Sequence, residues 1–344
     1  MGFSVDLLNK IRLWQDQDYK DRIPEATKNN LAEIGQAFST YTVQFNKFND
    51  AFIEKIGMTI LSDKFFTNRL AWAKKGFVSP HDVEEIFTEM CKSEGAFDPE
   101  GKNPLGRRSG PDSYVIYHRL NRQETYAISL SDLDFRKVFT SEAVLDSYLA
   151  GKINAMYSGA NRDEYLLTRN LIGSYKDKAG TGSGYVKYET TGMDDMAAYC
   201  KSFVKAVRKA VYDLTLEPSR NFNVAGVETW SEAKDLTLFV LSDVLVECDV
   251  ELLAKAFHQS NTDLKVVPRI IPMSNWGSDA EGNLQLTDTQ AILMDSDMLK
   301  IWDTRYKLLK QENAQGDFTN YFLHHDQILS MSTFKNAVRF CAKA

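Results

Sequence analysis

Apolar residues recur at three- and four-residue steps in five stretches of the chain, and this spacing predicts helices with one apolar face. The stretches cover residues 5–14, 31–57, 141–175, 196–211 and 250–257. Pro24 closes the segment before the second stretch, and Thr27 and Asn30 offer side-chain oxygens that suit a helix N-terminus. The third stretch is the longest, although Gly151 and Gly159 weaken it and favour a bend or break.

Short apolar runs bounded by turn residues predict strands. They lie at residues 58–61, 236–241, 268–272 and 291–294, and most of residues 306–340 also has the pattern of strands, with a final piece at 334–340 that is either helical or extended. Helix and strand alternate from residue 193 to residue 303, which is typical of a small α/β unit. The polar, glycine-rich segment KDKAGTGSGYVKYETTG, residues 176–192, is expected to be a flexible boundary before that unit.

Two strand-like arms flank a polar tip between residues 65 and 126. The tip, Phe97–Asp112, is rich in glycine and proline, so it cannot hold a core and is typical of an exposed turn. Arms and tip together predict a long hairpin that projects from the body of the protein. Because an isolated hairpin is marginally stable in water, we expect this one to lie on another surface.

The composition is that of a folded protein with no basic character. Of 344 residues, 43% are hydrophobic and 26% charged, which excludes a disordered or fibrous chain. The net charge of −6 argues against broad nucleic-acid binding through a basic face. Neither a secretory segment nor an apolar run of roughly 18 residues is present, so we expect no membrane partner.

Four cysteines are scattered along the chain, at Cys91, Cys200, Cys248 and Cys341. Zinc sites need ligands paired at close spacing, and this chain has no CxxC pair. We therefore expect four buried thiols in a protein of the reducing cytosol.

The strongest enzyme candidate is Asp295 with Asp297, directly after the apolar run at residues 291–294. Two carboxylates at a strand end can hold a divalent cation against a nucleotide diphosphate, which would indicate a metal-dependent nucleotide-sugar enzyme. The alternative is a turn in which Asp295 caps the following segment. This alternative is favoured because no glycine-rich phosphate loop accompanies the pair.

The adjacent histidines His324 and His325 are a second candidate for metal binding. Neighbours on a strand point to opposite faces, so structural roles are favoured for both. We expect no catalytic, cofactor-binding or metal-binding residue in this chain.

Basic residues cluster around the predicted hairpin: Lys74 and Lys75 at its base, Arg107 and Arg108 at its tip, and Arg119 and Arg122 on the returning arm. One interpretation is a solvated face. The other is that these cations meet acidic residues of a neighbouring copy, with Glu84, Glu85 and Glu89 as candidates. Each exposed pair would contribute only about 0–1 kcal/mol, but repetition across many copies could set their register.

Several stretches resemble, in the same order, the major capsid proteins of short-tailed phages of the phi-29 group. They are PEATKNNLAEIG at residues 24–35, FIEKIGMTIL at 52–61, VEEIFTEM at 83–90, YHRLNRQETY at 117–126, LTLFVLSDVLVECDVELLAKAFHQSNTD at 236–263 and NYFLHHDQILSMSTFKNAVRF at 320–340. The resemblance spans nearly the whole chain, and its specificity lies in the number and order of these stretches.

The resemblance implies an α+β protein with the Hong Kong 97 type capsid fold. Its parts would be an N-terminal arm and helix (1–64), an extended hairpin loop (65–127), a peripheral domain with a long spine helix (128–192), an axial α/β domain (193–303) and returning strands of the peripheral domain (304–344). The implied function is a major capsid protein that assembles into an icosahedral or prolate shell around double-stranded DNA.

The resemblance also implies partners. Copies would form the pentamers and hexamers of a virion shell, with a portal protein, after assembly in the host cytoplasm. About 60 residues precede the hairpin, so we expect a separate scaffolding protein rather than a fused segment. Some members of the group carry an additional immunoglobulin-like domain, for which this sequence has no counterpart. An encapsulin-like compartment shell with the same fold is the alternative.

Overall fold

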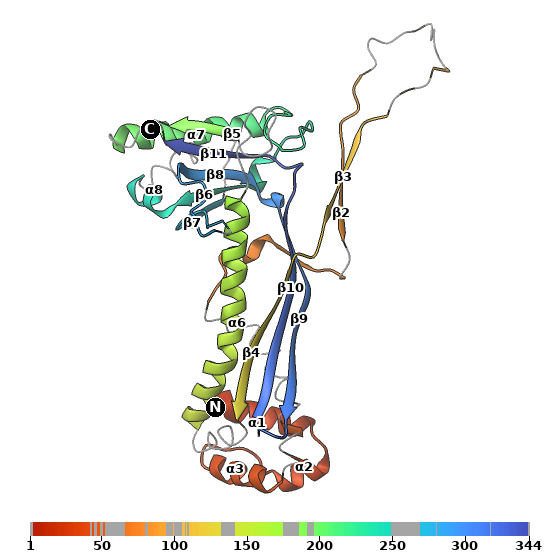
Figure 1. Ribbon diagram of the computed structural model, residues 1–344, viewed down its shortest axis with the longest axis vertical. Helices are drawn as coiled ribbons and strands as arrows, with labels where there is room; N and C mark the ends of the chain where they lie inside the picture. Colours follow the sequence, from red (N-terminus) through yellow and green to blue (C-terminus); the bar gives the residue numbers. More distant parts are fainter. Residues whose placement is uncertain are drawn as a thin grey trace. The chain divides into compact units, whose positions relative to one another are not determined.

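The computed structural model describes residues 3–41, 43–44, 47–48, 51, 66–79, 82–93, 99, 105–106, 108, 110–131, 142–174, 186–190, 196–248, 269–279, 281–316 and 318–342. Within them the chain divides into two compact units (Figure 1). Unit 1 comprises Met1–Ala71, Arg122–Tyr165 and Asp303–Gln327, and unit 2 comprises Trp72–Asn121, Leu166–Trp302 and Ile328–Ala344. No helix in the described ranges has the length and hydropathy needed to span a membrane.

Unit 1 is built on three N-terminal helices, one long helix and the strands of an antiparallel sheet. The helices are α1 (Phe3–Trp14), α2 (Gln17–Arg22), α3 (Leu31–Thr40) and α6 (Glu142–Gly173). The strands are β4 (Arg122–Ser131), β9 (Leu299–Asn313) and β10 (Phe318–Met331). The sheet has the order β1-β9-β10-β4, and its edge strand β1 (Lys74–Phe77) is counted in unit 2. The 32 residues of α6 span about 48 Å, and the helix passes through both predicted weak points without a break.

A single apolar core holds these elements of unit 1 together. In β4, Tyr126, Ile128 and Leu130 alternate with exposed positions, as a half-buried strand requires. Tyr126 lies opposite Leu323 of β10 in the antiparallel register. The same core includes side chains of α1, α3 and α6, such as Ile11, Phe38 and Ala160.

Unit 2 contains a mixed five-stranded sheet of order β5-β11-β8-β6-β7. Its strands are β5 (Val186–Thr190), β6 (Leu236–Leu241), β7 (Arg269–Met273), β8 (Thr289–Asp295) and β11 (Ala337–Ala342), and its helices are α7 (Met196–Thr215) and α8 (Ser242–Glu247). All seven residues of β8, which lies in the centre of the sheet between β6 and β11, are buried. The apolar face of α7 packs with β6, β8 and β11 in one core. Short 3₁₀ turns lie at Ala71–Ala73, Ala233–Asp235 and Ser296–Met298.

A separate two-stranded ribbon also belongs to unit 2. It pairs β2 (Val83–Thr88) with β3 (Ser113–His118) in antiparallel register, and among the described residues no third strand joins them (Figure 1). The sequence predicts one hairpin from residue 65 to residue 126, but the ribbon is shorter. Residues 122–131 pair instead with β10, because their alternating apolar side chains enter the core of unit 1.

The predicted helix at 141–175 and the strands at 236–241, 268–272 and 291–294 are confirmed as α6, β6, β7 and β8. Two other predictions are wrong. The helix that was expected to run unbroken to Gly57 is interrupted at Tyr41, the C-cap residue of α3, although the described residues 43–44, 47–48 and 51 beyond it are again helical. The expected linker 176–192 includes β5, which pairs in parallel with β11 despite its polar sequence.

Three further predictions concern the start of α3, the C-terminal strand and segments outside the described residues. Asn30 is the N-cap residue of α3, but its side chain accepts from the Thr27 N–H instead of capping the helix. In the tail, β11 pairs with β8 and so belongs to unit 2 rather than with the strands before it. The predicted strand 58–61, the predicted helix 250–257 and most of the hairpin tip lie outside the described residues.

The cysteines differ most from expectation. Cys200 and Cys248 form a disulfide, Cys91 is exposed, and only Cys341 is the buried free thiol that was predicted. The packing of α7 beside α8 brings the two bonded Cα atoms to 5.3 Å, although 48 residues separate them in the sequence. Closing a loop of that length stabilises the folded chain by about 4 kcal/mol in the chain-entropy description.

Candidate intersubunit interface

The ribbon of β2 and β3 has one covered face and one uncovered face. Side chains alternate between the faces along each strand. On the covered face, Phe87 stacks on Phe334 with ring centroids 5.5 Å apart. On the uncovered face, Ile86 lies directly opposite Val115, and these side chains are 61% and 44% exposed. Tyr117, on the same face, is 57% exposed, so the centre of this face is apolar and in contact with solvent.

Ion pairs attach the ribbon to the rest of unit 2. Glu85 lies 3.2 Å from Lys300, 3.1 Å from His118 and 3.0 Å from the Ser332 hydroxyl. Burial alone would raise the pKa of Glu85, but the bonds from His118, Lys300 and Ser332 outweigh burial and the pKa is lowered. Glu85 therefore stays ionised and holds the base of the ribbon.

The two carboxylates considered for cation binding have separate structural roles. Asp295 is 4% exposed, caps the 3₁₀ turn and accepts from the Asp297 N–H at 2.9 Å. Burial raises the pKa of Asp295. Asp297 lies 2.8 Å from Lys75 and 2.9 Å from Lys300; burial opposes ionisation, but these cations hold its pKa well below the usual value. The favoured alternative, a capped turn, is confirmed.

The predicted contact residues fall into two groups. Glu84, Arg108 and Arg119 are exposed. Arg119 lies 3.1 Å from Asp82, with both side chains exposed, and Glu84 accepts from Tyr117 at 3.3 Å.

Lys75, Arg122 and Glu89 have partners within their own units, and Glu89 is buried against Arg220 at 2.6 Å. Lys75 binds Asp297, and Lys74 is half-buried on β1. Arg122 is 4% exposed and donates to Glu124 at 2.9 Å and to the Tyr126 hydroxyl at 2.8 Å. Arg107 lies outside the described residues.

Sequence reasoning missed a buried polar cluster in unit 1. Glu164, Asp303 and His325 are each at most 4% exposed, and their ligand-type atoms all lie within 4.8 Å of one another. His325 Nε2 is 3.1 Å from Asp303 and 3.7 Å from Glu164. His324, by contrast, contacts Thr125, so the two histidines point to opposite faces as predicted. Glu164 and Asp303 stand 139 residues apart, and nothing local in the sequence indicates that they meet.

The cluster has the residue types of a metal centre, but its hydrogen bonds favour an internal network. The Gln327 amide donates to both Glu164 and Asp303 at 2.7 Å. Arg122 donates to the Gln327 carbonyl oxygen, and this fixes the amide with its N–H group toward the acids. A cation would have to displace that group while lying close to a guanidinium. Asn68 completes the network with a 2.7 Å bond to Glu164.

This arrangement defines a class of protein. The fold of the chain is similar to that of solved phage capsid proteins. The chain superimposes on a subunit of the Staphylococcus phage Andhra capsid with a TM-score of 0.62 at 14% identity, over 82% of this chain and 86% of the other. For the mature capsid of bacteriophage PhiM1 the TM-score is 0.56 at 12% identity, over 81% and 88%. The fold is the Hong Kong 97 type capsid fold.

Sequence comparison identifies the family within this class. The model of the Phi29-like phage major capsid protein family matches residues 8–341, and the chain belongs to that family. The major capsid protein of Bacillus phage PZA is 30% identical over 339 residues, covering 98% of this chain and 72% of that protein. The major capsid protein of Streptococcus phage Cp-1 is 24% identical, covering 97% and 93%.

The family settles the competing interpretations. The protein is a major capsid protein of a tailed phage, a structural component of the virion and not an enzyme. Its shell is assembled from many copies of this chain. Neither the nucleotide-sugar enzyme nor the encapsulin-like compartment is favoured.

Proposed function

We propose that each copy in the shell lays its ribbon on a neighbouring copy. The observation that carries this proposal is the uncovered face of β2 and β3, where Ile86, Val115 and Tyr117 expose apolar surface at the centre of a two-stranded sheet. A ribbon without a third strand gains most from a second surface. Burial of about 1,000 Å² or more at each contact would reach the size of a specific interface.

Exposed charges at the edge of this face would set its register. Glu84 lies on the uncovered face itself, and Arg108 and Arg119 are exposed elsewhere in the hairpin region. Lys75 and Glu85 are better explained as the groups that hold the ribbon to its own unit. Arg122 is too deeply buried to meet another copy while the unit is intact.

Each segment of the chain would then form one part of the capsid subunit. Residues 1–64 would form the arm and first helices, 65–127 the extended loop, 128–192 the peripheral domain with its spine helix, and 193–303 the axial domain around five- and six-fold axes. Residues 304–344 would return to the peripheral domain, except that β11 supplies a strand to the sheet of unit 2. Pentamers and hexamers of such copies would close the shell.

The partners follow from the same role. A separate scaffolding protein would direct assembly in the host cytoplasm, a portal protein would occupy one vertex, and the shell would enclose double-stranded DNA without reading its sequence. The net charge of −6 supports enclosure over tight binding, because a basic surface is what DNA affinity requires.

Replacing Ile86 and Tyr117 with Glu tests the ribbon contact. Both side chains are exposed within the chain, so the double variant should fold while its shell yield falls at least tenfold, because two charges would be buried in each contact. Circular dichroism reports folding, and sedimentation with electron microscopy reports shells, with scaffolding protein co-expressed.

Ile86→Val is the matched control, since it keeps an apolar side chain at the same position, and it should assemble normally.

Deleting residues 99–110, like the double Glu variant, should leave a folded subunit with impaired assembly. Shells of normal yield from the double Glu variant would refute the assigned contact.

A further inference from the structure

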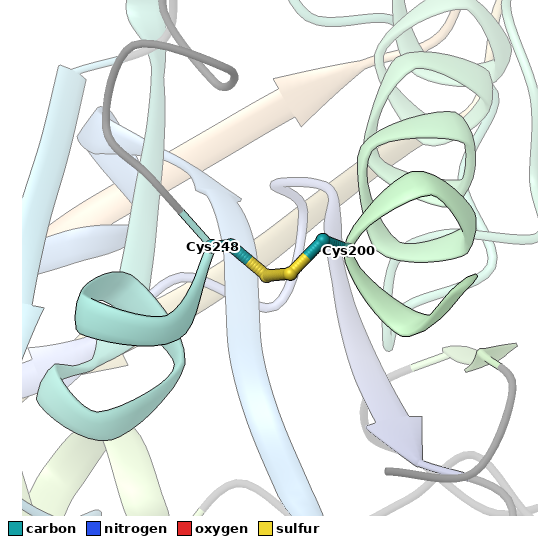
Figure 2. The surroundings of a disulfide bond; sticks show 2 residues. All are labelled: Cys200 and Cys248. Atoms are coloured by element: carbon teal, nitrogen blue, oxygen red, sulfur yellow. A yellow bond between two sulfur atoms is a disulfide. The ribbon is translucent and has the colours of Figure 1, made fainter. Parts of the chain in front are cut away.

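The disulfide of unit 2 joins two elements that the chain otherwise connects through the strand β6. Cys200 lies in the second turn of α7, and Cys248 is the residue directly after α8 (Figure 2). Their Cα separation of 5.3 Å lies within the usual range for a disulfide. Figure 2 shows the bond running from Cys200 on α7 to Cys248 at the end of α8.

Both cysteines are buried in the same apolar core. Cys200 is 7% exposed and Cys248 is fully buried, in a cluster that also contains Phe203 and Val244. A reduced cysteine behaves as a small apolar side chain, so this core can hold two thiols as well as one disulfide. The fold of unit 2 is therefore compatible with both oxidation states.

The bond acts mainly on α8, which is six residues long. A helix of that length is unstable by itself and depends on tertiary contacts. Its C-terminus is held by the Cys248 N–H, which donates to the Val244 carbonyl at 2.8 Å. The disulfide adds a covalent tether from this point to the 20-residue helix α7.

The environment decides when that tether can form. Thiols are kept reduced in a cytosol, whereas a released particle meets dissolved dioxygen. We propose that Cys200 and Cys248 are thiols while the shell assembles and are oxidised to the disulfide after the particle leaves the cell. This rests on the proposed assembly in the host cytoplasm. The pair is thus a post-assembly modification site that strengthens the finished shell.

The reaction balances with dioxygen as the oxidant. The two S–H bonds break and one S–S bond forms, releasing two protons and two electrons. Dioxygen accepts both and leaves as hydrogen peroxide. Local opening of α8 gives the oxidant access to the buried sulfurs.

The other two cysteines serve as internal references. Cys341 is buried, and burial raises the pKa of its thiol to about 11, so it supplies little of the reactive thiolate. Cys91 is exposed and can form bonds between molecules during handling. The experiment therefore uses a Cys91→Ser background.

The timing is tested by trapping thiols with N-ethylmaleimide. Cells containing assembled shells are lysed directly into the reagent under denaturing conditions, and a second sample is trapped after the particles have stood in air. Mass spectrometry should find Cys200 and Cys248 alkylated in the first sample and disulfide-linked in the second. A linked pair in shells trapped inside the cells, or thiols that persist in air, would overturn the proposal.

The effect on the shell is tested by heating particles with and without a reductant. Air-oxidised shells should unfold about 10 °C above reduced shells, and Cys248→Ser shells should match the reduced ones in both conditions. The main comparison is between oxidised and reduced wild-type shells, so it does not require the Cys248→Ser variant to fold well. Equal unfolding temperatures for the oxidised and reduced wild type would contradict a strengthening role.

Shell yield separates this proposal from the assembly role itself. The double variant C200S/C248S should form shells at wild-type yield when assembled in cells, since both sulfurs are buried in the core of unit 2 and neither cysteine is part of the ribbon's uncovered face. A loss of shells would contradict the idea that the bond forms after assembly, while leaving the capsid function intact. Normal shell yield from the ribbon variants described above would instead contradict the proposed ribbon contact and would leave the disulfide proposal unaffected.

Discussion

Gln327 shows how one side chain can hold a buried network in unit 1. Its amide donates to two carboxylates and accepts from Arg122, and the residue has no solvent exposure. Buried charges are tolerated only when their hydrogen bonds are complete. The network is therefore expected to fix the pairing of β10 with its surroundings rather than to perform chemistry.

Replacing Gln327 with Leu should destabilise the subunit by about 3–5 kcal/mol, because Glu164, Asp303 and Arg122 each lose a partner in the interior. Urea unfolding of the unassembled subunit measures this difference. His324→Ala, on the other face of the same strand, is the control and should change stability by about 0.5 kcal/mol. A Gln327→Leu subunit as stable as the control would show that the network is dispensable.

At the scale of elements, α6 illustrates both uses of glycine in a helix. A Cβ atom at Gly151 would meet nothing within 4 Å. A Cβ atom at Gly173 would lie 1.8 Å from the Trp276 carbonyl oxygen, so any residue larger than glycine would clash with the backbone there. The first glycine only lowers helix stability, whereas the second allows backbone to approach backbone at the end of α6.

Gly151→Ala should therefore stabilise the subunit by about 0.5–1 kcal/mol, and Gly173→Ala should destabilise it by several times as much. Thermal unfolding of the two variants side by side tests the contrast, and each serves as the other's control. A stabilising Gly173→Ala would mean that the close approach to Trp276 is not maintained in solution.

Periodicity was sufficient for the elements whose apolar face is strong. The 3.6-residue period of α7 and the continuous apolar runs of β6 and β8 have one interpretation each, and these elements are found where they were expected. β5 was missed because VKYET has no apolar face of its own and becomes a strand only by pairing with β11. The disulfide and the Glu164 cluster were missed for the same reason, since residues distant in sequence make them.

Part of the candidate interface was also accessible from sequence. A hairpin with basic and acidic residues was expected, and the ribbon at residues 83–118 is present. The sequence could not separate charges that hold the ribbon to its own unit, such as Glu85, from those left exposed, such as Glu84. Side chains alternate between the two faces of β2, so Glu84 and Glu85 point to opposite faces. Which of the two faces is covered follows only from the pairing and packing of the strands in the structure.

For the whole molecule, the carboxylates with lowered pKa values make stability depend on acidity. Glu85, Glu124, Asp288 and Asp297 all have folded-state pKa values below their ordinary ones. A lowered pKa contributes stability above the unfolded value and loses it as the pH falls through the folded one. Asp295, whose pKa is raised, acts in the opposite sense.

The subunit should accordingly lose stability as the pH falls below about 4.5 and continue to lose it through the range below 3.8. Asp297→Asn should cost about 1 kcal/mol at pH 7, a modest value because the side chain is 42% exposed. That difference should narrow with acidification below pH 3.8, because Asp297 then takes up a proton in the unfolded wild type while it stays ionised in the folded one. Urea unfolding at pH 7, 4 and 3 checks both, and a difference that stays constant with pH would contradict the assignment.

A ribbon of only two strands has a further consequence for a protein that must tile a closed surface. Twist varies more in two-stranded ribbons than in larger sheets, because no third strand restrains it. We expect β2 and β3 to differ in twist between copies at the sharply curved vertices and copies on the flatter facets, while β6 and β8 stay alike. One polypeptide could then satisfy several local curvatures by adjusting a single pair of strands.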